Sequence, residues 1–355
     1  MAKDPLEEVA ERFEKILTSN GIHFVFRKDN PTLWDEGLRG LAYTPVSSLP
    51  LMMDYQLSYA ECDGKAVLDL SIILIQDHKP VGVWSVSLMI KNDVIFFGSS
   101  GGSLEPPMLS VNVGRRKITS LYKSCFNAVE DICTNLVFGK ILCVQPTQEC
   151  DAAITVWQDL FLRKGAQVKL AYDLFLDLKS DLTKIKSHLR DSYKSLINLG
   201  YKIWTVGILD CDSPNIWAEF KTLHHTVSGR VTRSDKTWQL QYDAILTDTA
   251  FLVYLRNGQN QMIGGGLFYR SCDESLYAVG VYDRALFDKP LGHVVQFHAI
   301  TYLKQKGVRW HKLGPNLYPA DQPTPSPKEL SITEFKRGFA SHIFPRYIIN
   351  YESLA

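Results

Sequence analysis

The sequence has neither a long hydrophobic run nor an excess of charge of one sign. Lys and Arg number 39 and Asp and Glu number 38, which leaves a formal net charge of +1. This balance argues against a protein that coats DNA or a polyanionic surface, although a local basic patch could still bind RNA or phosphate. The longest apolar runs, such as Ile72–Ile75 and Val94–Phe97, suit buried strands and are much shorter than the ~20 residues of a membrane helix. We therefore expect no membrane span and no DNA partner.

Cysteine is also sparse, and its spacing is irregular. The odd set of seven contains no Cys-x-x-Cys pair and consists of Cys62, Cys125, Cys133, Cys143, Cys150, Cys211 and Cys272. This pattern predicts neither a disulfide framework nor a zinc knuckle, and most of these residues are expected to be buried thiols in a reducing cytoplasm. The acidic, polar first residues contain no secretory signal, which favours the same compartment. His224, His225, His293 and His298 lack partners at ligand spacing, so we expect no metal site.

The composition that is present is that of a globular chain, with 45% apolar and 22% charged residues. At roughly 150 residues per domain, 355 residues predict about two domains. A meander of strand-like segments, a glycine-bearing loop and a long helix occur in both Val81–Val137 and Ile263–Lys306. We therefore predict an α+β fold with two mixed-sheet domains, residues 1–170 and 171–340, followed by a segment, 341–355, that could return to the first domain.

Several individual elements can be predicted as well. Ala66–Gln76, Val81–Ile90 and Val94–Gly98 are interpreted as strands. One amphipathic helix is expected after Ser180 as its N-cap, ending at Gly200. The proline-rich stretch Asn316–Lys328 is typical of a mobile lid or spacer.

Two glycine-rich motifs resemble catalytic signatures but fail on context. Gly98–Gly102 satisfies G-x-S-x-G, yet Pro106 and Pro107 follow closely and block the helix that a nucleophile elbow needs. Gln261–Gly266 matches the pyrophosphate loop of acyl-coenzyme A transferases, which requires a helix N-terminus. Here the glycines lead into an apolar strand, so a strand that bends or lets a ligand approach is the better interpretation.

The strongest local pattern lies near the C-terminus. Ser331 and Glu334 form a capping box, which predicts that a short helix starts there. Phe335 and Phe339 then share a helix face, with Lys336 beside them. Taken alone, this pattern suits an aromatic anchor with a solvated lysine.

The wider context gives that pattern another meaning. The segments Leu176–Lys194, Ser228–Ser234, Gly292–Gly307, Lys312–Gly314 and Phe335–Phe339 resemble the Fem-family (FemABX-like) aminoacyltransferases. The similarity covers residues ~170 to 340, and the first half is similar only in element order. The resemblance implies two tandem acetyltransferase-like (GNAT-like) domains, each with a mixed, mainly antiparallel sheet flanked by helices. It also implies transfer of an amino acid from aminoacyl-tRNA to an amine of a cell-wall (peptidoglycan) or surface-glycan precursor.

The resemblance assigns roles to individual residues. Lys336 would stabilise the oxyanion and Phe335 would help to receive the tRNA end, in agreement with the general use of fixed cations at developing negative charge. Arg233 matches the family's phosphate-binding arginine, but Thr237 replaces a tyrosine, which puts a uridine-diphosphate acceptor in doubt. The expected substrate-binding residues are Arg233, Arg230, Tyr277 and Trp238. Ala340 replaces the glycine that usually ends the motif, and Arg27 and Lys28 are candidate acceptor-binding residues in the first half.

The expected tRNA contacts are basic residues around the helix after Ser180 and beside Lys336. They are Lys184, Arg190, Lys194 and Arg337. A solvated helix face explains the first three equally well, whereas a phosphate-binding strip would make binding salt-dependent. No cofactor is expected. Two rival functions stay open: an acyl-coenzyme A-dependent N-acyltransferase acting on an amino sugar or peptide, and a non-catalytic ligand-binding protein with the same fold.

Overall fold

The chain forms two compact units in the computed structural model. The structure describes residues 5–62, 64–91, 94–135, 140–144 and 154–352. Contacts divide the chain into a first unit of Met1–Thr44, Gln56–Leu170 and Arg346–Ala355 and a second unit of Pro45–Tyr55 and Ala171–Pro345. Three elements contain a boundary between the units, and these are α3 (Pro50–Cys62), β9 (Gln167–Asp177) and β15 (His342–Glu352).

The first unit combines small antiparallel sheets with helices. Its elements are α1 (Pro5–Ser19), β1 (Phe24–Phe26), α2 (Pro31–Arg39), β2 (Ala66–Asp69), β3 (Ile72–Gln76), β4 (Lys79–Trp84), β5 (Ser87–Lys91), β6 (Val94–Gly98), β7 (Met108–Leu109), α4 (Arg115–Asn135), β8 (Lys140–Val144) and α5 (Val156–Arg163). Strands β1-β3-β4-β7 form one sheet and β2-β5-β6 form another. Strand β15 pairs antiparallel with β8 over Ile348–Glu352.

The strands predicted over Ala66–Gln76 and Val81–Ile90 are each two strands, so both predictions are wrong in this respect. The chain steps from one sheet to the other near Ser71 and Val86. The Ser71 hydroxyl donates to the Val86 carbonyl and accepts from the Val86 amide, both at 3.2 Å. The Ser71 side chain thus adds to the backbone bond from the Leu70 amide to the Val86 carbonyl, at 3.0 Å, and a period-two apolar pattern does not reveal this step.

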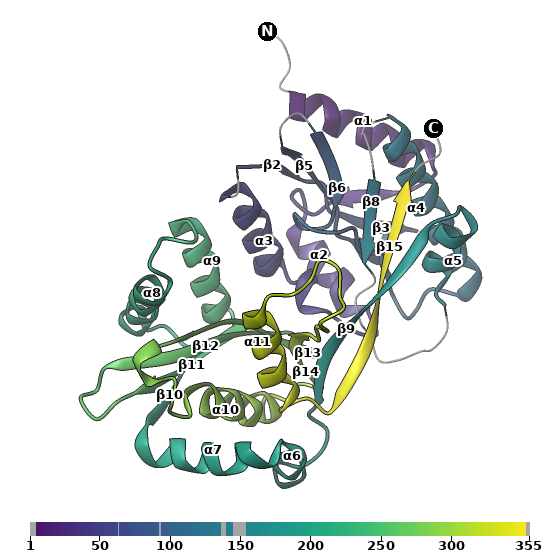
Figure 1. The fold of residues 1–355 in the computed structure, drawn as a ribbon. Coiled ribbons are helices and arrows are strands. Elements are labelled where there is room, and N and C mark those ends of the chain that lie inside the picture. The colour runs from purple at the N-terminus through teal and green to yellow at the C-terminus, as the bar shows by residue number, and fades with distance from the viewer. Residues whose placement is uncertain (1–4, 63, 92–93, 136–139, 145–153, 353–355) are drawn as a thin grey trace. The chain divides into compact units, whose positions relative to one another are not determined.

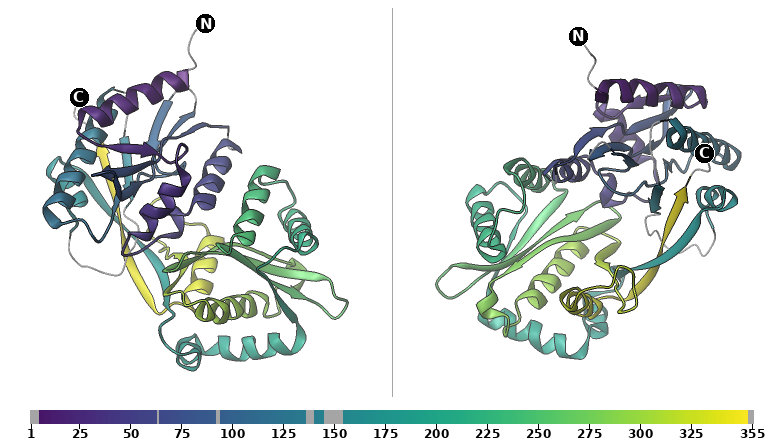
Figure 2. Two further views of the ribbon diagram at one scale, coloured as in Figure 1. Left: turned by 180° about the vertical axis from the view of Figure 1, so that it is seen from behind. Right: turned by 45° about the horizontal axis from the view of Figure 1, so that its top comes forward.

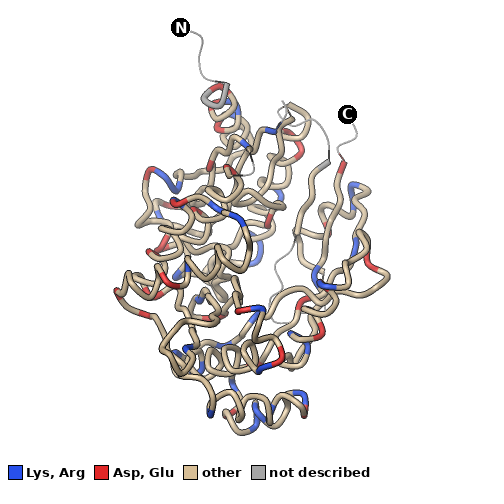
Figure 3. The backbone as a smooth tube through the Cα atoms, turned by 60° about the vertical axis from the view of Figure 1, so that its left-hand side comes forward, with Lys and Arg blue, Asp and Glu red and all other residues tan. Residues whose placement is uncertain are grey.

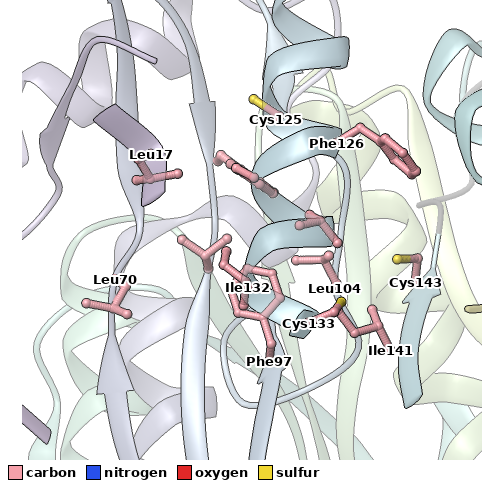
Figure 4. Packing of buried hydrophobic residues seen from close by; sticks show 14 of the residues in the cluster. Leu17, Leu70, Phe97, Leu104, Cys125, Phe126, Ile132, Cys133, Ile141 and Cys143 are labelled. Carbon is pink, nitrogen blue, oxygen red and sulfur yellow. The ribbon is translucent and has the colours of Figure 1, made fainter. Parts of the chain in front are cut away.

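The core of the first unit is built between helices α1, α4 and α5 and the strands (Figure 4). Phe126 and Phe161 meet edge to face, with ring centres 4.7 Å apart. Cys125, Cys133 and Cys143 are buried in this core, and burial raises the pKa of Cys133 to about 12. Such thiols are chemically inert.

The six described cysteines are free thiols. Three are buried, and the three exposed ones are Cys62, Cys211 and Cys272. The seventh, Cys150, lies outside the described residues. The prediction of buried thiols therefore holds for half of the described set.

The second unit is a twisted sheet with helices on both faces (Figures 1 and 2). Its further elements are η1 (Val46–Ser48), α6 (Leu182–His188), α7 (Asp191–Ile203), β10 (Thr205–Leu209), α8 (Pro214–Ser228), α9 (Asp235–Leu246), β11 (Ala250–Arg256), β12 (Met262–Arg270), β13 (Glu274–Tyr282), η2 (Arg284–Leu286), α10 (Leu291–Gln305), β14 (Trp310–Pro315) and α11 (Pro327–Arg337). Within the unit the strand order is β10-β11-β12-β13-β14-β9. Neighbouring residues of β12 lie on opposite faces of the sheet. Phe268 packs in the core with α10, whereas Tyr269 packs in the core with α8 and α9.

Strands β13 and β14 pair in parallel, and their pairing is short. It ends with Leu276 opposite Lys312. Beyond this point β13 continues beside β12 as far as Tyr282, and β14 continues beside β9 as far as Pro315. The two strands therefore diverge after a few residues.

The helix predicted after Ser180 is two helices, α6 and α7. Asp181, and not Ser180, caps α6 by accepting from the Lys184 amide at 2.8 Å. Leu189 then has extended backbone angles (φ −62°, ψ 154°) and is buried. The Arg190 amide donates to the Gly338 carbonyl at 3.0 Å. Tertiary contacts therefore interrupt the predicted helix between the apolar residues of α6 and those of α7.

The helix that carries Lys336 starts earlier than predicted. Its capping box is formed by Ser326 and Glu329, with Pro327 at the first helical position. The predicted box at Ser331 and Glu334 is wrong because both residues lie inside α11. No helix in the described ranges combines the length and the apolar character needed to cross a membrane.

Candidate active site

Lys336 lies at the C-terminal end of α11 and reaches β14 at Gly314. Gly314 has φ +122°, and a Cβ at this position would lie 2.8 Å from Lys336 Nζ. The ammonium also lies 5.6 Å from the centre of the Tyr277 ring. Tyr277 is the first residue of β13 beyond its pairing with β14. The charge of Lys336 is thus held where the two parallel strands diverge, and the missing side chain of Gly314 provides the space.

A buried polar layer lies beside this ammonium. The Ser275 hydroxyl is 2.7 Å from His311 Nδ1, and His311 Nε2 is 3.2 Å from Gln296 Oε1. Since the amide oxygen can only accept, Nε2 carries the proton and Nδ1 accepts from the hydroxyl. Burial, followed by the charge of Lys336, lowers the pKa of His311 to about 3. The imidazole is therefore neutral.

Tyr277 belongs to the same layer. Its hydroxyl is 3.1 Å from that of Tyr282, and burial raises the pKa of both phenols. The Tyr277 ring stacks on Phe268, with ring centres 5.1 Å apart. These contacts fix the aromatic face that Lys336 approaches.

A carboxylate lies on the neighbouring strand β9. Asp173 has 1% exposure and forms an ion pair with Lys312 at 3.1 Å. Burial lowers the pKa of Lys336, and the Asp173 carboxylate acts in the opposite direction. The ion pair of Asp173 with Lys312 therefore lies on β9 and β14, next to the strand end that carries Gly314.

Phe335 packs among other aromatic rings, as the spacing of Phe335 and Phe339 predicts for an aromatic anchor. Its ring lies 5.2 Å from that of His293, 5.4 Å from that of Phe339 and 6.0 Å from that of Tyr193. The Tyr193 hydroxyl donates to the Phe335 carbonyl at 3.0 Å. A Cβ at Gly338 would clash with the Tyr193 ring, so this glycine allows α7 to approach α11. This packing fixes the backbone from which Lys336 projects.

Arg233 lies on the other face of the sheet, between α8 and α9. Its guanidinium is 4.8 Å from the centre of the Trp238 ring and donates to Gln241 Oε1 at 3.1 Å. Five buried nitrogens here have no hydrogen-bond partner within the described part of the chain: Arg233 Nε, Trp238 Nε1, His224 Nδ1, His225 Nε2 and Gln241 Nε2. Burial, followed by the charges of Arg233 and His225, lowers the pKa of His224 to about 4. The cluster is rich in donors and cationic.

The structure does not bring together all of the predicted substrate-binding residues. Tyr277 packs with the α10 core, whereas Trp238 belongs to the α8–α9 core, so Tyr277 and Arg233 lie on opposite faces of the sheet. Arg230 is exposed. The Thr237 hydroxyl donates to the Ser234 carbonyl at 2.7 Å, within the cap of α9. Sequence spacing cannot show which face a residue joins when the register of the sheet is unknown.

Basic residues are distributed along α6 and α7, and Asp191 is the acidic residue within these two helices (Figure 3). Lys184 is exposed, Lys194 pairs with Asp191 at 2.9 Å, and Arg190 pairs with Glu334 at 3.2 Å. Beside them is an open, mostly apolar groove of about 470 Å³. It is lined by Leu182, Thr183, Lys186, Ser187, Lys194 and Phe297.

Three other predicted basic residues have partners within the protein. The Arg337 guanidinium donates to Asn316 Oδ1 at 2.7 Å and to Glu334 Oε1 at 2.6 Å. In the first unit, Arg27 forms an ion pair with Asp69 at 2.6 Å. Lys28 Nζ lies 5.3 Å from the centre of the Phe26 ring.

Neither glycine-rich motif is followed by the helix start that its catalytic signature requires, as predicted. Gly264–Gly266 lie inside strand β12, and β6 ends at Gly98 in a loop with no helix start. Within the described ranges, no cluster of His, Cys, Asp or Glu could hold a metal ion.

Sequence reasoning missed Asp173, His311 and Gly314. Asp173 did carry a signal, because it is a lone carboxylate in an apolar strand segment, and such a residue is buried only when paired. Gly314 shows no periodic pattern, and its role depends on a lysine more than twenty residues later.

Comparison with known proteins identifies the fold. No protein-family model matches the sequence, and no curated protein matches it. Among solved structures, FemX has a TM-score of 0.66 and 10% identity, with 92% of this chain and 96% of FemX covered. L-PGS from Bacillus licheniformis has a TM-score of 0.54 and 10% identity, with 90% and 91% covered. The C-terminal domain of a putative lysylphosphatidylglycerol synthetase from Agrobacterium fabrum has a TM-score of 0.54 and 10% identity, with 91% of this chain and 93% of that domain covered.

These similarities extend over nearly the whole of each chain. The protein thus has a Fem-like fold, which confirms the α+β fold class predicted from the sequence.

Proposed function

We propose that the protein is an N-acyltransferase that moves an amino acid from aminoacyl-tRNA to an amine of a cell-wall or surface-glycan precursor. The observation that carries this proposal is the Lys336 ammonium, held against Gly314 where β13 and β14 diverge. Its neighbour His311 is neutral, so the positive charge beside the strand ends is that of lysine. The Fem-like fold supports the same reaction class.

In this reaction the amine nitrogen of the acceptor attacks the ester carbonyl carbon of the donor. Electrons move to the carbonyl oxygen, and the Lys336 ammonium stabilises the oxyanion. Collapse of the intermediate breaks the bond between the acyl carbon and the ribose oxygen. The proton lost by the amine balances the new ribose hydroxyl. Because the ester is already activated, no covalent enzyme intermediate is required.

The donor-rich cluster around Arg233 suits an anionic group of the acceptor. A buried N–H without a partner costs about 1–3 kcal/mol, and an anion could satisfy Arg233 Nε and Trp238 Nε1 together. Thr237 uses its hydroxyl inside the α9 cap, so the cluster differs from the family pattern. A small phosphorylated precursor or a lipid-linked phosphate fits this chemistry. The structural neighbour from Agrobacterium fabrum is named as a putative lysylphosphatidylglycerol synthetase, and this name supports a lipid-linked acceptor as one candidate.

The RNA end would be received on the side of α6, α7 and α11. Phe335 and the exposed Lys184 belong to this side, and Arg190 joins α11 to the start of α7 through Glu334. Lys194 lies at the edge of the apolar groove, where a phosphate could replace its pairing with Asp191. We place the reaction in the cytoplasm, where charged tRNA is available.

A transfer assay tests the proposal. Mixed charged tRNA and acetyl-coenzyme A are offered separately with amines from a cell extract, and products are detected by mass. A ribonuclease-sensitive gain of one amino acid supports the proposal. A gain that needs the thioester and survives ribonuclease shows that the donor is an acyl-coenzyme A, and binding without any product shows a non-catalytic protein.

Replacement of Lys336 tests the site directly. Lys336→Ala should lower kcat by about 10²–10³-fold, the usual loss for an oxyanion-stabilising donor. Lys306→Ala is a matched control, because Lys306 pairs with Asp248 on the surface at 3.2 Å, and it should transfer at the wild-type rate. Full activity of Lys336→Ala would show that another group stabilises the oxyanion.

A further inference from the structure

Helix α8 carries two histidines, His224 and His225, that the proposed reaction does not use. Their ring centres lie 5.1 and 5.8 Å from that of Trp238 on α9. His224 Nδ1, His225 Nε2 and Trp238 Nε1 are buried and have no hydrogen-bond partner among the described residues. His224 has 9% exposure and Trp238 has 2%. Three aromatic side chains that each lack a partner at a buried nitrogen therefore meet at one place.

Two further buried nitrogens of this cluster belong to Arg233 and Gln241. Arg233 Nη1 donates to Gln241 Oε1 at 3.1 Å. Because a guanidinium can only donate, this contact fixes the orientation of the Gln241 amide. Gln241 Nε2, on a side chain with 0% exposure, is then the end of the amide without a partner, and Arg233 Nε has none either.

The cluster offers donors beside a permanent cation. The Trp238 indole and the Nε2 end of Gln241 can only donate, and an imidazole donates from whichever nitrogen carries its proton. The carboxylate at the start of α9, Asp235, is paired with Lys221 on α8 at 2.5 Å. Buried donors without partners around a guanidinium fit an anionic ligand.

The ring planes indicate which kind of anion fits. The planes of His224 and His225 make an angle of 75°, and each makes an angle of 78° with the plane of Trp238. Ring N–H bonds lie in the plane of their ring, so the three donors point in different directions. The oxygens of a phosphoryl group are arranged tetrahedrally and accept from several directions, whereas a carboxylate has its two oxygens in one plane. A phosphoryl group therefore fits the cluster better than a carboxylate.

We propose that His224, His225 and Gln241 are ligand-binding residues that complete, with Arg233 and Trp238, a site for a phosphoryl group. This inference rests on the proposed function, in which the acceptor carries an anionic group, and it names the side chains beyond the arginine that recognise this group. Arg233 is partly exposed, so a ligand can enter from the loop between α8 and α9. The diphosphate of a nucleotide-linked acceptor and the phosphodiester of a lipid headgroup share this chemistry.

Titration calorimetry tests the site with inorganic pyrophosphate, uridine diphosphate and dioctanoyl phosphatidylglycerol below its critical micelle concentration. Pyrophosphate should bind, and acetate at the same concentration should not displace it. Tighter binding of uridine diphosphate than of pyrophosphate would support a nucleotide-linked ligand, and tighter binding of the lipid would support a lipid-linked one. Absence of binding by all three phosphoryl probes, or displacement of pyrophosphate by acetate, would overturn the proposal.

Gln241→Glu tests the donor end of the amide. This variant keeps an oxygen that accepts from Arg233 and replaces the Nε2 donor by a negatively charged oxygen. It should weaken pyrophosphate binding by about 100-fold, because a like charge then faces the anion. The control is Gln239→Glu on the same helix, since Gln239 is exposed and donates to Asp243 at 2.8 Å, and it should bind pyrophosphate as the wild type does.

His224→Phe and His225→Phe test the histidines and keep an aromatic ring against Trp238. Each should weaken pyrophosphate binding by about tenfold, since a hydrogen bond to a charged group is lost. His298→Phe is the control: His298 lies on α10, where its Nδ1 is 3.1 Å from the Tyr201 hydroxyl, and the affinity should not change.

Stability separates ligand binding from a structural role. Without ligand, His224→Phe removes a buried nitrogen that has no partner, so the free energy of unfolding in urea should not fall. A histidine that holds the fold together would lose stability instead. Lower stability with unchanged affinity would therefore overturn the proposal. If Gln241→Glu does not fold, the two histidine variants provide the affinity comparison.

Transfer kinetics distinguish failure of this proposal from failure of the proposed function. If both are right, the histidine variants raise the KM of the acceptor and leave kcat nearly unchanged. Pyrophosphate binding with the predicted variant effects, but without any transfer by the wild-type protein, would support the phosphoryl site and overturn the reaction. Transfer with an unchanged acceptor KM in both histidine variants would keep the reaction and overturn the role of His224 and His225.

Discussion

Gly314→Ala should separate backbone strain from displacement of the catalytic ammonium. The new Cβ would lie 2.8 Å from Lys336 Nζ, so the ammonium has to withdraw by about half an ångström or more to reach an ordinary contact. Misplacement of a reacting group by 1 Å can cost ~10²-fold in rate. We therefore expect kcat to fall by about 10- to 100-fold with little change in KM. At φ +122°, an alanine also costs about 1–3 kcal/mol of stability.

Gly307→Ala provides the matched control. Gly307 also has a positive φ, +74°, but nothing lies within 4 Å of its would-be Cβ. It should lose about 1–2 kcal/mol of unfolding free energy and keep the wild-type rate. Both variants should stay folded, because typical stabilities are about 5–15 kcal/mol. Urea denaturation gives the stabilities and the transfer assay gives the rates. A wild-type rate for Gly314→Ala, or an equal rate loss for Gly307→Ala, would refute this account of the site.

Two further predictions concern other parts of the second unit. Arg233→Ala should raise the KM of the acceptor and change the KM of the donor little. Arg256→Ala is the control, because it removes an ion pair with Glu219, and it should change neither KM. Steady-state kinetics with each substrate varied in turn measures both constants, and a higher donor KM in Arg233→Ala would contradict the assignment. His293 has a folded-state pKa of about 4 against 6.5 ordinarily, so the unfolded chain binds the proton first and stability should fall as pH drops from 6.5 toward 4. Denaturant titrations over this range should show a smaller slope for His293→Phe, and an unchanged slope would contradict the assignment.

The sequence supported the organisation of the second half better than that of the first. The strand with Gly264–Gly266 and the helix after Gly292 follow simple periods, and the structure contains both. In the first half, Ser71 joins two sheets through its side chain. The apolar pattern in the sequence therefore continues across the point where one strand ends and the next strand begins.

The start of α11 shows a different limit of local pattern. Ser326 with Glu329 and Ser331 with Glu334 have the same capping-box spacing. Pro327 distinguishes them, because proline favours the first helical position. The sequence pattern around Lys336 was recognised, but the setting of this lysine depends on Gly314, which approaches it only in the folded protein. Pairing between distant strands is not encoded by spacing along the chain.

The place of β15 has a consequence for biosynthesis. Ile348–Glu352 pair with β8, and Ile349 and Tyr351 are buried in the core of the first unit. This unit contains α1 but lacks one of its strands until β15 has been synthesised. Its nascent form therefore exposes the edge of β8 and an unfilled apolar core while the whole second unit is being made. Completion of the first unit therefore follows synthesis of the second unit, and deletion of Ile348–Glu352 should act as a core deletion in the first unit.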